Sequence, residues 1–104
     1  MRSRIVLGAR GDRHLAYWCD ACGRQHAPRI HADDTGSGGG VWSWNGSFAR
    51  PTLSPNVDVN AALDPAFGAR CDHFVLDGRL EYLAASTHAM AGRNVEMSLL
   101  SRST

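Results

Sequence analysis

Three cysteines and the histidines near them are the side chains of this sequence best suited to chemistry. Cys19 and Cys22 form a Cys-x-x-Cys-Gly knuckle, and Cys71 and His73 stand two residues apart much later in the chain. Thiolates and imidazoles are the usual ligands of a structural zinc ion, and Cys-x₂-Cys is the usual spacing of its first ligand pair. The sequence therefore predicts a Cys₃His zinc site made of Cys19, Cys22, Cys71 and His73.

The fourth ligand has two further candidates. His26 follows the knuckle closely enough to reach back to it, and His88 is free to approach from the C-terminal part. We rank His73 first, His26 second and His88 third. The competing interpretation is that the thiols are small buried side chains and that His73 is merely hydrogen-bonded, because free cysteine is among the most buried residue types. A redox Cys-x-x-Cys is disfavoured, since such a motif is typical of a βαβ setting that this chain lacks.

Length and composition indicate a small globular protein. The 104 residues predict one domain, residues 1–104, whose modest core would gain from a metal crosslink. Every basic residue is arginine, and 11 of them against 10 acidic residues leave the chain almost neutral, which disfavours a nucleic-acid partner. An odd number of cysteines favours a reducing compartment. No apolar run is long enough for a membrane span or a signal peptide, so we expect a cytoplasmic protein with no membrane partner.

Short apolar runs separated by glycine, proline and asparagine predict an all-β or β-rich fold. We expect a single small domain of short antiparallel strands with a zinc-ribbon-like knuckle and almost no helix. The expected strands or extended segments are residues 4–9, 14–18, 26–31, 41–44, 47–59, 70–84 and 93–100, with loops at 33–40 and 60–69 and a frayed end at 101–104.

The hairpin within residues 70–84 is the clearest of these elements. Asp77-Gly78 between two apolar runs is a strong signal for a two-residue turn. That turn sets Leu76 opposite Arg79 and His73 opposite Tyr82. Since strand side chains alternate, one inward face then carries Cys71, His73, Val75, Leu80, Tyr82 and Ala84. The proposed ligands Cys71 and His73 would thus point into the interior together.

A hydrolase is the alternative to a purely structural site. Hydroxyls at Thr52, Ser54 and Ser86 could pair with His88, but the chain has no Gly-x-Ser-x-Gly elbow and no His-Glu-x-x-His. A zinc ion with three protein ligands could instead activate a water, with Asp72 or Glu81 as the base. This variant is weaker, because four ligands are at hand to close the site.

Several motifs together resemble a small protein family common in tailed phages and prophages. Its members are often labelled "ammonia monooxygenase", an activity that nothing in this sequence supports. The motifs, in order, are Cys-x-x-Cys-Gly-x-x-His (Cys19 to His26), Trp-x-Trp-Asn-Gly-x₃-Arg-Pro-Thr-Leu-Ser-Pro (Trp42 to Pro55), Cys-Asp-His-Phe-Val-x-Asp-Gly-Arg-Leu-x-Tyr-Leu (Cys71 to Leu83) and Ser-Thr-His-Ala-Met-Ala-Gly (Ser86 to Gly92). The resemblance covers roughly residues 17–97.

The pattern is also distantly similar to BubE, a peptidase encoded beside bacterial ubiquitin-like conjugation genes. That group shares the cysteine-rich knuckle, a Thr-Leu-x-Pro-Ser segment, and a cysteine followed by histidine and an aromatic residue. The resemblance implies a zinc-associated β-rich fold and a role in cutting ubiquitin-like tails. This chain departs from the pattern at two positions. Asn56 replaces the serine of the Pro-Ser pair, and Asp72 stands where the phage relatives usually carry histidine directly after the third cysteine.

Two functions follow as expectations. The first is a zinc-stabilised phage or prophage module that binds a host or phage protein. The second is a BubE-like peptidase acting on ubiquitin-like proteins. It requires His88 or His73 within hydrogen-bond reach of Ser54, Thr52 or Ser86, and our first choice is Ser54, two residues before Asn56, as nucleophile and His88 as base.

Overall fold

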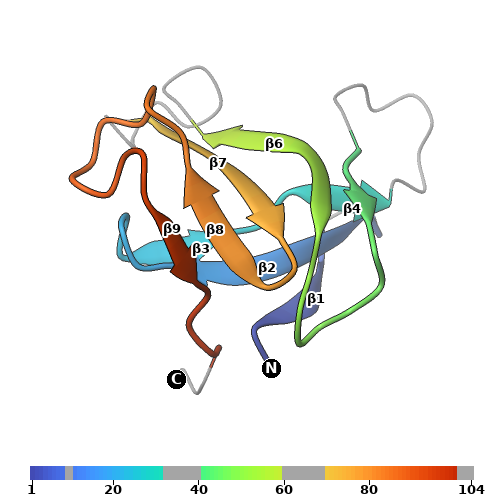
Figure 1. Ribbon diagram of the computed structural model, residues 1–104. Helices are drawn as coiled ribbons and strands as arrows, with labels where there is room; N and C mark the ends of the chain where they lie inside the picture. The colour runs from blue at the N-terminus through green and yellow to red at the C-terminus, as the bar shows by residue number, and fades with distance from the viewer. Residues whose placement is uncertain (9–10, 32–40, 60–69, 101–104) are drawn as a thin grey trace.

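The described residues build two antiparallel sheets and contain no helix. The computed structural model describes residues 1–8, 11–31, 41–59 and 70–100 (Figure 1). Their strands are β1 (Ser3–Leu7), β2 (Arg13–Cys19), β3 (Arg24–His26), β4 (Arg29–His31), β5 (Ser43–Trp44), β6 (Leu53–Val59), β7 (Cys71–Leu76), β8 (Arg79–Tyr82) and β9 (Asn94–Glu96). The predicted all-β class is therefore confirmed. Within the described ranges, no helical segment could cross a bilayer.

The first sheet is organised around β2. Strand β1 pairs with one edge of β2, while β3 and β4 follow one another along the other edge. The strand expected over residues 26–31 is thus two short strands, interrupted by Ala27 and Pro28. Proline has no amide hydrogen to donate to a ladder, and here its carbonyl instead accepts the Leu15 amide at 3.0 Å.

The second sheet is a meander in the order β5-β6-β7-β8-β9. Its hairpin has the predicted register, with Leu76 opposite Arg79 and His73 opposite Tyr82. The last predicted strand is shorter than expected, since β9 ends at Glu96. Expected elements at residues 33–40, 60–69 and 101–104, and the end of the first strand at Ala9, lie outside the described residues.

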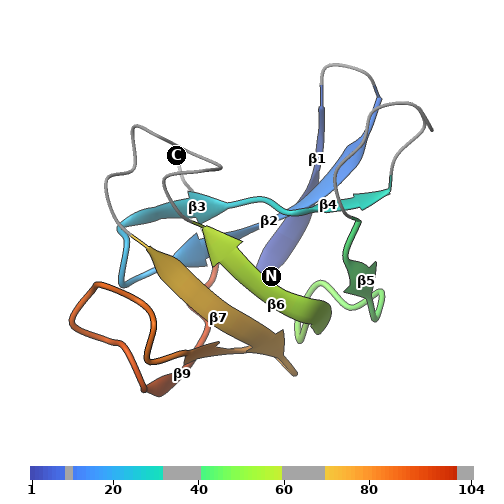
Figure 2. The same ribbon diagram turned by 90° about the horizontal axis from the view of Figure 1, so that it is seen from above.

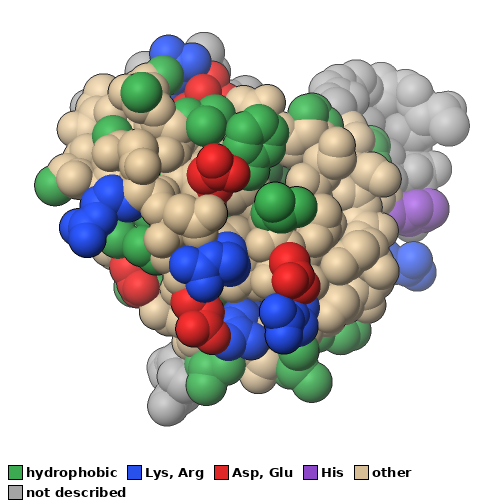
Figure 3. Space-filling view, in the orientation of Figure 1, with side chains coloured by type: hydrophobic (Ala, Val, Ile, Leu, Met, Phe, Trp, Pro, Cys, Tyr) green, Lys and Arg blue, Asp and Glu red, His purple; other side chains and the backbone are tan. Residues whose placement is uncertain are grey.

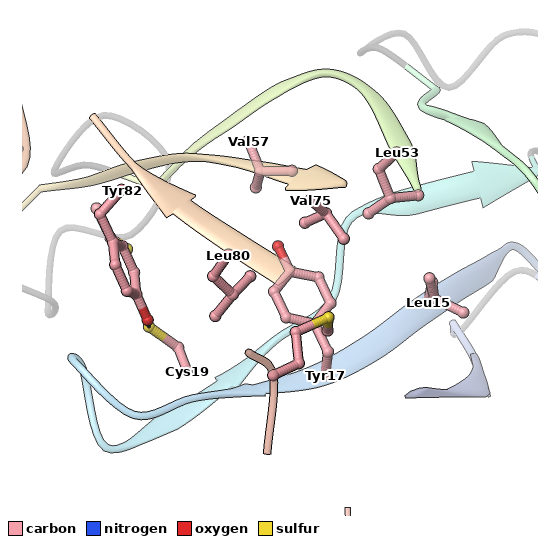
Figure 4. Close-up of a cluster of buried hydrophobic side chains, with 10 residues drawn as sticks. Leu15, Tyr17, Cys19, Leu53, Val57, Val75, Leu80 and Tyr82 are labelled. Carbon is pink, nitrogen blue, oxygen red and sulfur yellow. The ribbon is translucent and has the colours of Figure 1, made fainter. Parts of the chain in front are cut away.

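The two sheets pack face to face, with their strands crossing at an angle (Figure 2). The core between them is Leu15, Tyr17, Cys19, Leu53, Val57, Cys71, Val75, Leu80, Tyr82 and Met97 (Figure 4). Both sheets contribute through alternate residues, as expected for strands with one buried face. The predicted inward face of the hairpin is buried from Cys71 to Tyr82, but Ala84 is exposed. This part of the prediction was wrong because β8 ends at Tyr82 and a turn follows.

The β7–β8 turn is held by the segment before β6. Asp77 and Gly78 have φ values of 49° and 76°, as a two-residue hairpin turn of this kind requires. The Asp77 amide donates to Thr52 Oγ1 at 2.8 Å, and the Gly78 amide donates to the Pro51 carbonyl at 2.9 Å. A Cβ at position 78 would lie 3.2 Å from the Arg50 Cα. The turn therefore needs glycine both for its backbone angle and for this close approach.

Replacing Gly78 with alanine should destabilise the protein more than replacing Gly46. Both glycines have positive φ, 76° and 84°, but a Cβ at Gly46 meets nothing within 4 Å. We expect Gly46→Ala to lower the free energy of unfolding by about 1 kcal/mol and Gly78→Ala by about 2 kcal/mol or more. Urea unfolding measures both. Equal losses would show that contact with Arg50 adds nothing to the conformational strain.

Candidate metal centre and its surroundings

Four potential metal ligands converge where the two sheets meet. Cys19 ends β2, Cys22 lies in the knuckle turn, His26 ends β3 and Cys71 begins β7. One ligand atom from each of the four lies within 4.8 Å of all the others. Cys19, His26 and Cys71 are buried, and Cys22 is half-buried. The described structure thus offers a site that could bind a metal ion and would crosslink the two sheets through it.

The spacing of the sulfurs suits a tetrahedral ion. Cys19 Sγ and Cys71 Sγ are 3.9 Å apart. Two thiolates bound to one tetrahedral zinc ion at about 2.3 Å each would be about 3.8 Å apart. The same separation is far longer than the sulfur–sulfur bond of a disulfide, about 2.05 Å, and all three cysteines are free thiols. The donor set therefore fits a metal ion better than a disulfide.

His26 faces the cluster because of the register of its strand. In the β2–β3 pair, His26 lies opposite Tyr17, two residues before Cys19 on the same inward face. The knuckle between the strands is closed by the Gly23 amide, which donates to the Cys19 carbonyl at 2.9 Å, with Gly23 at a φ of 66°. In the sequence, pairing residues outward from the knuckle, Cys19 with Arg24 and then Tyr17 with His26, is the signal that points to His26.

His73, the first-ranked fourth ligand, lies beside this group of four rather than within it. Its Nε2 is 2.6 Å from the Tyr17 hydroxyl, its Nδ1 is 3.4 Å from Cys71 Sγ, and its ring stacks on His26 at 5.3 Å. Burial, reinforced by His26, lowers the pKa of His73 to about 4. The ring is therefore neutral at pH 7, and a single proton on Nδ1 lets it donate to the sulfur and accept from Tyr17. Ligation by His73 stays a prediction.

Further groups surround the sulfurs. His88 Nε2 is 3.4 Å from Cys71 Sγ, so two imidazoles contact this sulfur. The Tyr82 hydroxyl is 3.1 Å from Cys19 Sγ (Figure 4). The hydrogen bond from Cys71 lowers the pKa of the Cys19 thiol against the opposing effect of burial, and His26 and Tyr82 add to the lowering. Such contacts favour the thiolate, which is the form that binds metals.

The structure does not bring Ser54 and His88 together. Ser54 is exposed on β6 beside Ser43 of β5. His88 contacts Cys71, which pairs with Val59 at the other end of β6. Five residues of strand span roughly 16 Å. Their pairing as nucleophile and base therefore stays a prediction without support from the register.

The other two candidate hydroxyls are occupied by backbone groups. Thr52 Oγ1 accepts the Asp77 amide at 2.8 Å. Ser86 Oγ accepts the Asp72 amide at 2.8 Å and donates to the Asp72 carbonyl at 2.9 Å. Both side chains hold backbone in place, and Ser86 is itself buried.

A contact that sequence reasoning missed joins Asn56 and Asp72, 16 residues apart in the chain. Asn56 Nδ2 donates to Asp72 Oδ1 at 2.6 Å. Other hydrogen bonds fix the backbone of both residues. Trp42 Nε1 donates to the Asn56 carbonyl at 3.1 Å, and the Asp72 amide donates to Ser86 Oγ. The β6–β7 ladder sets Asp58 opposite Asp72, so Asn56, two residues before Asp58, is a diagonal neighbour of Asp72 on the same face. Only the pairing of β6 with β7 reveals this contact.

Comparison with protein families gives a match over most of the chain. Residues 1–83 match the family described as "Bacterial ubiquitination-like system serine protease (BubE)". The chain belongs to the BubE family. The matched range includes the knuckle, His26, Asn56, Asp72 and His73, while His88 lies beyond it. Comparison with curated proteins and with solved structures finds no match.

Tyr17→Phe should destabilise the protein more than Tyr82→Phe. Removing the Tyr17 hydroxyl leaves fully buried His73 Nε2 without its 2.6 Å partner, at a cost of about 1–3 kcal/mol. Removing the Tyr82 hydroxyl takes one contact from Cys19 Sγ, a weaker acceptor that keeps its contact with Cys71 Sγ. Urea unfolding of the two matched variants gives the comparison. A larger loss for Tyr82→Phe would contradict the assigned role of the Tyr17–His73 bond.

Proposed function

We propose that this chain is a zinc-stabilised member of the BubE family that binds a ubiquitin-like or other small protein without cleaving it through a serine. The observation that carries the proposal is the hydrogen bond between Asn56 and Asp72. These are the two positions at which the chain departs from the patterns it resembles. The BubE pattern has serine at position 56, and the phage relatives usually have histidine at position 72.

The hydrogen bond connects the two departures, Asn56 and Asp72, in space. Serine at position 56 and histidine at position 72 would place a hydroxyl beside an imidazole, the arrangement that activates a serine nucleophile. Asparagine and aspartate occupy the same place here with a 2.6 Å hydrogen bond. An amide nitrogen is no nucleophile of this kind, and the carboxylate is engaged by it. The pair retains the local fold while lacking the chemistry implied by the family's printed name.

Zinc is the metal that best fits the centre. Three thiols and one imidazole are a common structural zinc set, and four protein ligands leave no position for an activated water. When bound, the ion would supply a crosslink between the sheets. Cys19, Cys22, His26 and Cys71 would hold it, with His73 and His88 beside Cys71. This role is structural and agrees with a binding function.

The partner and the setting follow from the resemblances. Membership of a family named for a ubiquitination-like system favours a ubiquitin-like partner. The motifs shared with tailed-phage and prophage proteins favour a phage or host protein met in the bacterial cytoplasm. A BubE-like peptidase using Ser54 and His88 is the second candidate, and it would require these two residues to approach each other.

Metal analysis tests the centre and separates the two candidate histidines. We expect one zinc ion per chain, lost in Cys22→Ser and in His26→Ala but retained in His73→Ala, because His26 lies with the thiols. His26→Cys should restore metal binding, and its Co²⁺ complex should show stronger thiolate charge-transfer absorption, since a fourth sulfur replaces nitrogen. Loss of metal from His73→Ala with retention in His26→Ala would assign the fourth ligand to His73.

Labelling with a fluorophosphonate probe tests the absence of an activated serine. The wild-type chain should not be labelled, and neither should Asn56→Ser or Asp72→His alone, because each lacks one half of the pair. The double variant Asn56→Ser/Asp72→His should be labelled, since it juxtaposes hydroxyl and imidazole. Mass spectrometry locates the adduct. Labelling of the wild-type chain at Ser54 would contradict the proposal and favour the second candidate.

A further inference from the structure

The outer face of the second sheet exposes two large apolar side chains next to the Asn56–Asp72 pair. Phe74 and Leu76 alternate with buried residues of β7, so they point away from the core on the same side as Asp72. Phe74 is 39% exposed and Leu76 is 54% exposed. Figure 3 shows hydrophobic side chains in the middle of a face whose lower part, toward the β7–β8 turn, carries basic and acidic side chains.

At the turn end of this face lies a depression of about 180 Å³. It is lined by Arg2, Arg50, Asp77, Gly78, Arg79 and Glu96. Two of the three arginines have acidic partners, since Arg2 pairs with Glu96 and Arg50 binds both carboxylate oxygens of Asp77. Three guanidinium groups against two carboxylates leave one positive charge in excess.

Arg79 provides the excess charge. Its Nε donates to Asn94 Oδ1 at 2.6 Å and its Nη2 lies 3.4 Å from the Asn94 carbonyl, so these partners are neutral. It stands opposite Leu76 across the hairpin, and therefore at the end of the apolar pair. Guanidinium groups bind carboxylates with strong, charge-assisted hydrogen bonds. The depression thus offers an anion site adjoining an apolar strip.

Resting on the proposed function, we propose that this face binds the C-terminal tail of the partner protein in extended form, with its terminal carboxylate at Arg79. From Asp72 to Leu76 the strand rises roughly 13 Å, the length of about four extended residues. Alternate side chains of such a tail would pack on Phe74 and Leu76. The tail would then run from the Asn56–Asp72 pair to the depression that contains Arg79. The pair would lie beside the bound tail.

Titration of the ¹⁵N-labelled, zinc-loaded protein with acetyl-Leu-Ala-Leu-Gly tests the inference. We expect chemical-shift changes at the amides of Phe74, Leu76 and Arg79. The same peptide with a C-terminal amide should bind about fivefold more weakly, as expected for the loss of one exposed charge-assisted contact. Arg79→Gln should bind acid and amide equally, whereas Arg13→Gln, on the first sheet, should retain the difference.

Equal binding of acid and amide by the wild-type chain would overturn the carboxylate anchor, and so would shifts confined to other surfaces or the absence of binding. None of these results bears on probe labelling, so the proposed function would stand. Conversely, probe labelling of the wild-type chain would contradict the proposed function. The comparison of the peptide acid with the peptide amide would still show whether a C-terminal carboxylate binds at Arg79.

Discussion

The approach of Cys71 to Cys19 across the interface between the sheets constrains the whole structure. Their sulfurs, 3.9 Å apart, belong to β7 and β2, the central strands of their sheets. Cys22 and His26 complete the group from the knuckle and from β3. A chain of this size buries a limited apolar core, so a metal ion bound by these four residues would add stability that the core alone does not supply.

The groups around the sulfurs extend this constraint into the core. His73 is fully buried and bridges Tyr17 of β2 and Cys71 of its own strand, while Tyr82 of β8 reaches Cys19. Buried polar groups are costly unless hydrogen-bonded, and these partners come from both sheets. The network therefore fixes how the sheets are placed relative to one another, beyond what the packing of Leu15, Leu53 or Val75 would specify.

Strand alternation separates the two sites on β7. Cys71 and His73 point inward to the metal centre, whereas Asp72, Phe74 and Leu76 point outward. The same six-residue strand thus carries part of the candidate metal centre on one face and the Asn56–Asp72 pair with its apolar neighbours on the other. The inward contacts of Cys71 and His73 with Cys19 and Tyr17 tie β7 to the first sheet and leave its outward side chains free of that role.

The amino-acid sequence alone determined the β-rich class, the Asp77-Gly78 register and the inward placement of Cys71 and His73. These features depend on the residues of a two-residue turn and on the period-two alternation of strand side chains. Both can be identified from residues that are adjacent in the sequence. Tertiary structure decided which histidine joins the thiols and which polar residues meet. His26 stands with the cluster because β3 pairs with β2, and Asn56 reaches Asp72 because β6 pairs with β7 so that Asp58 lies opposite Asp72. The knuckle hairpin directs His26 inward and strand alternation directs His73 inward, so only the packing of the two sheets separates these two candidates.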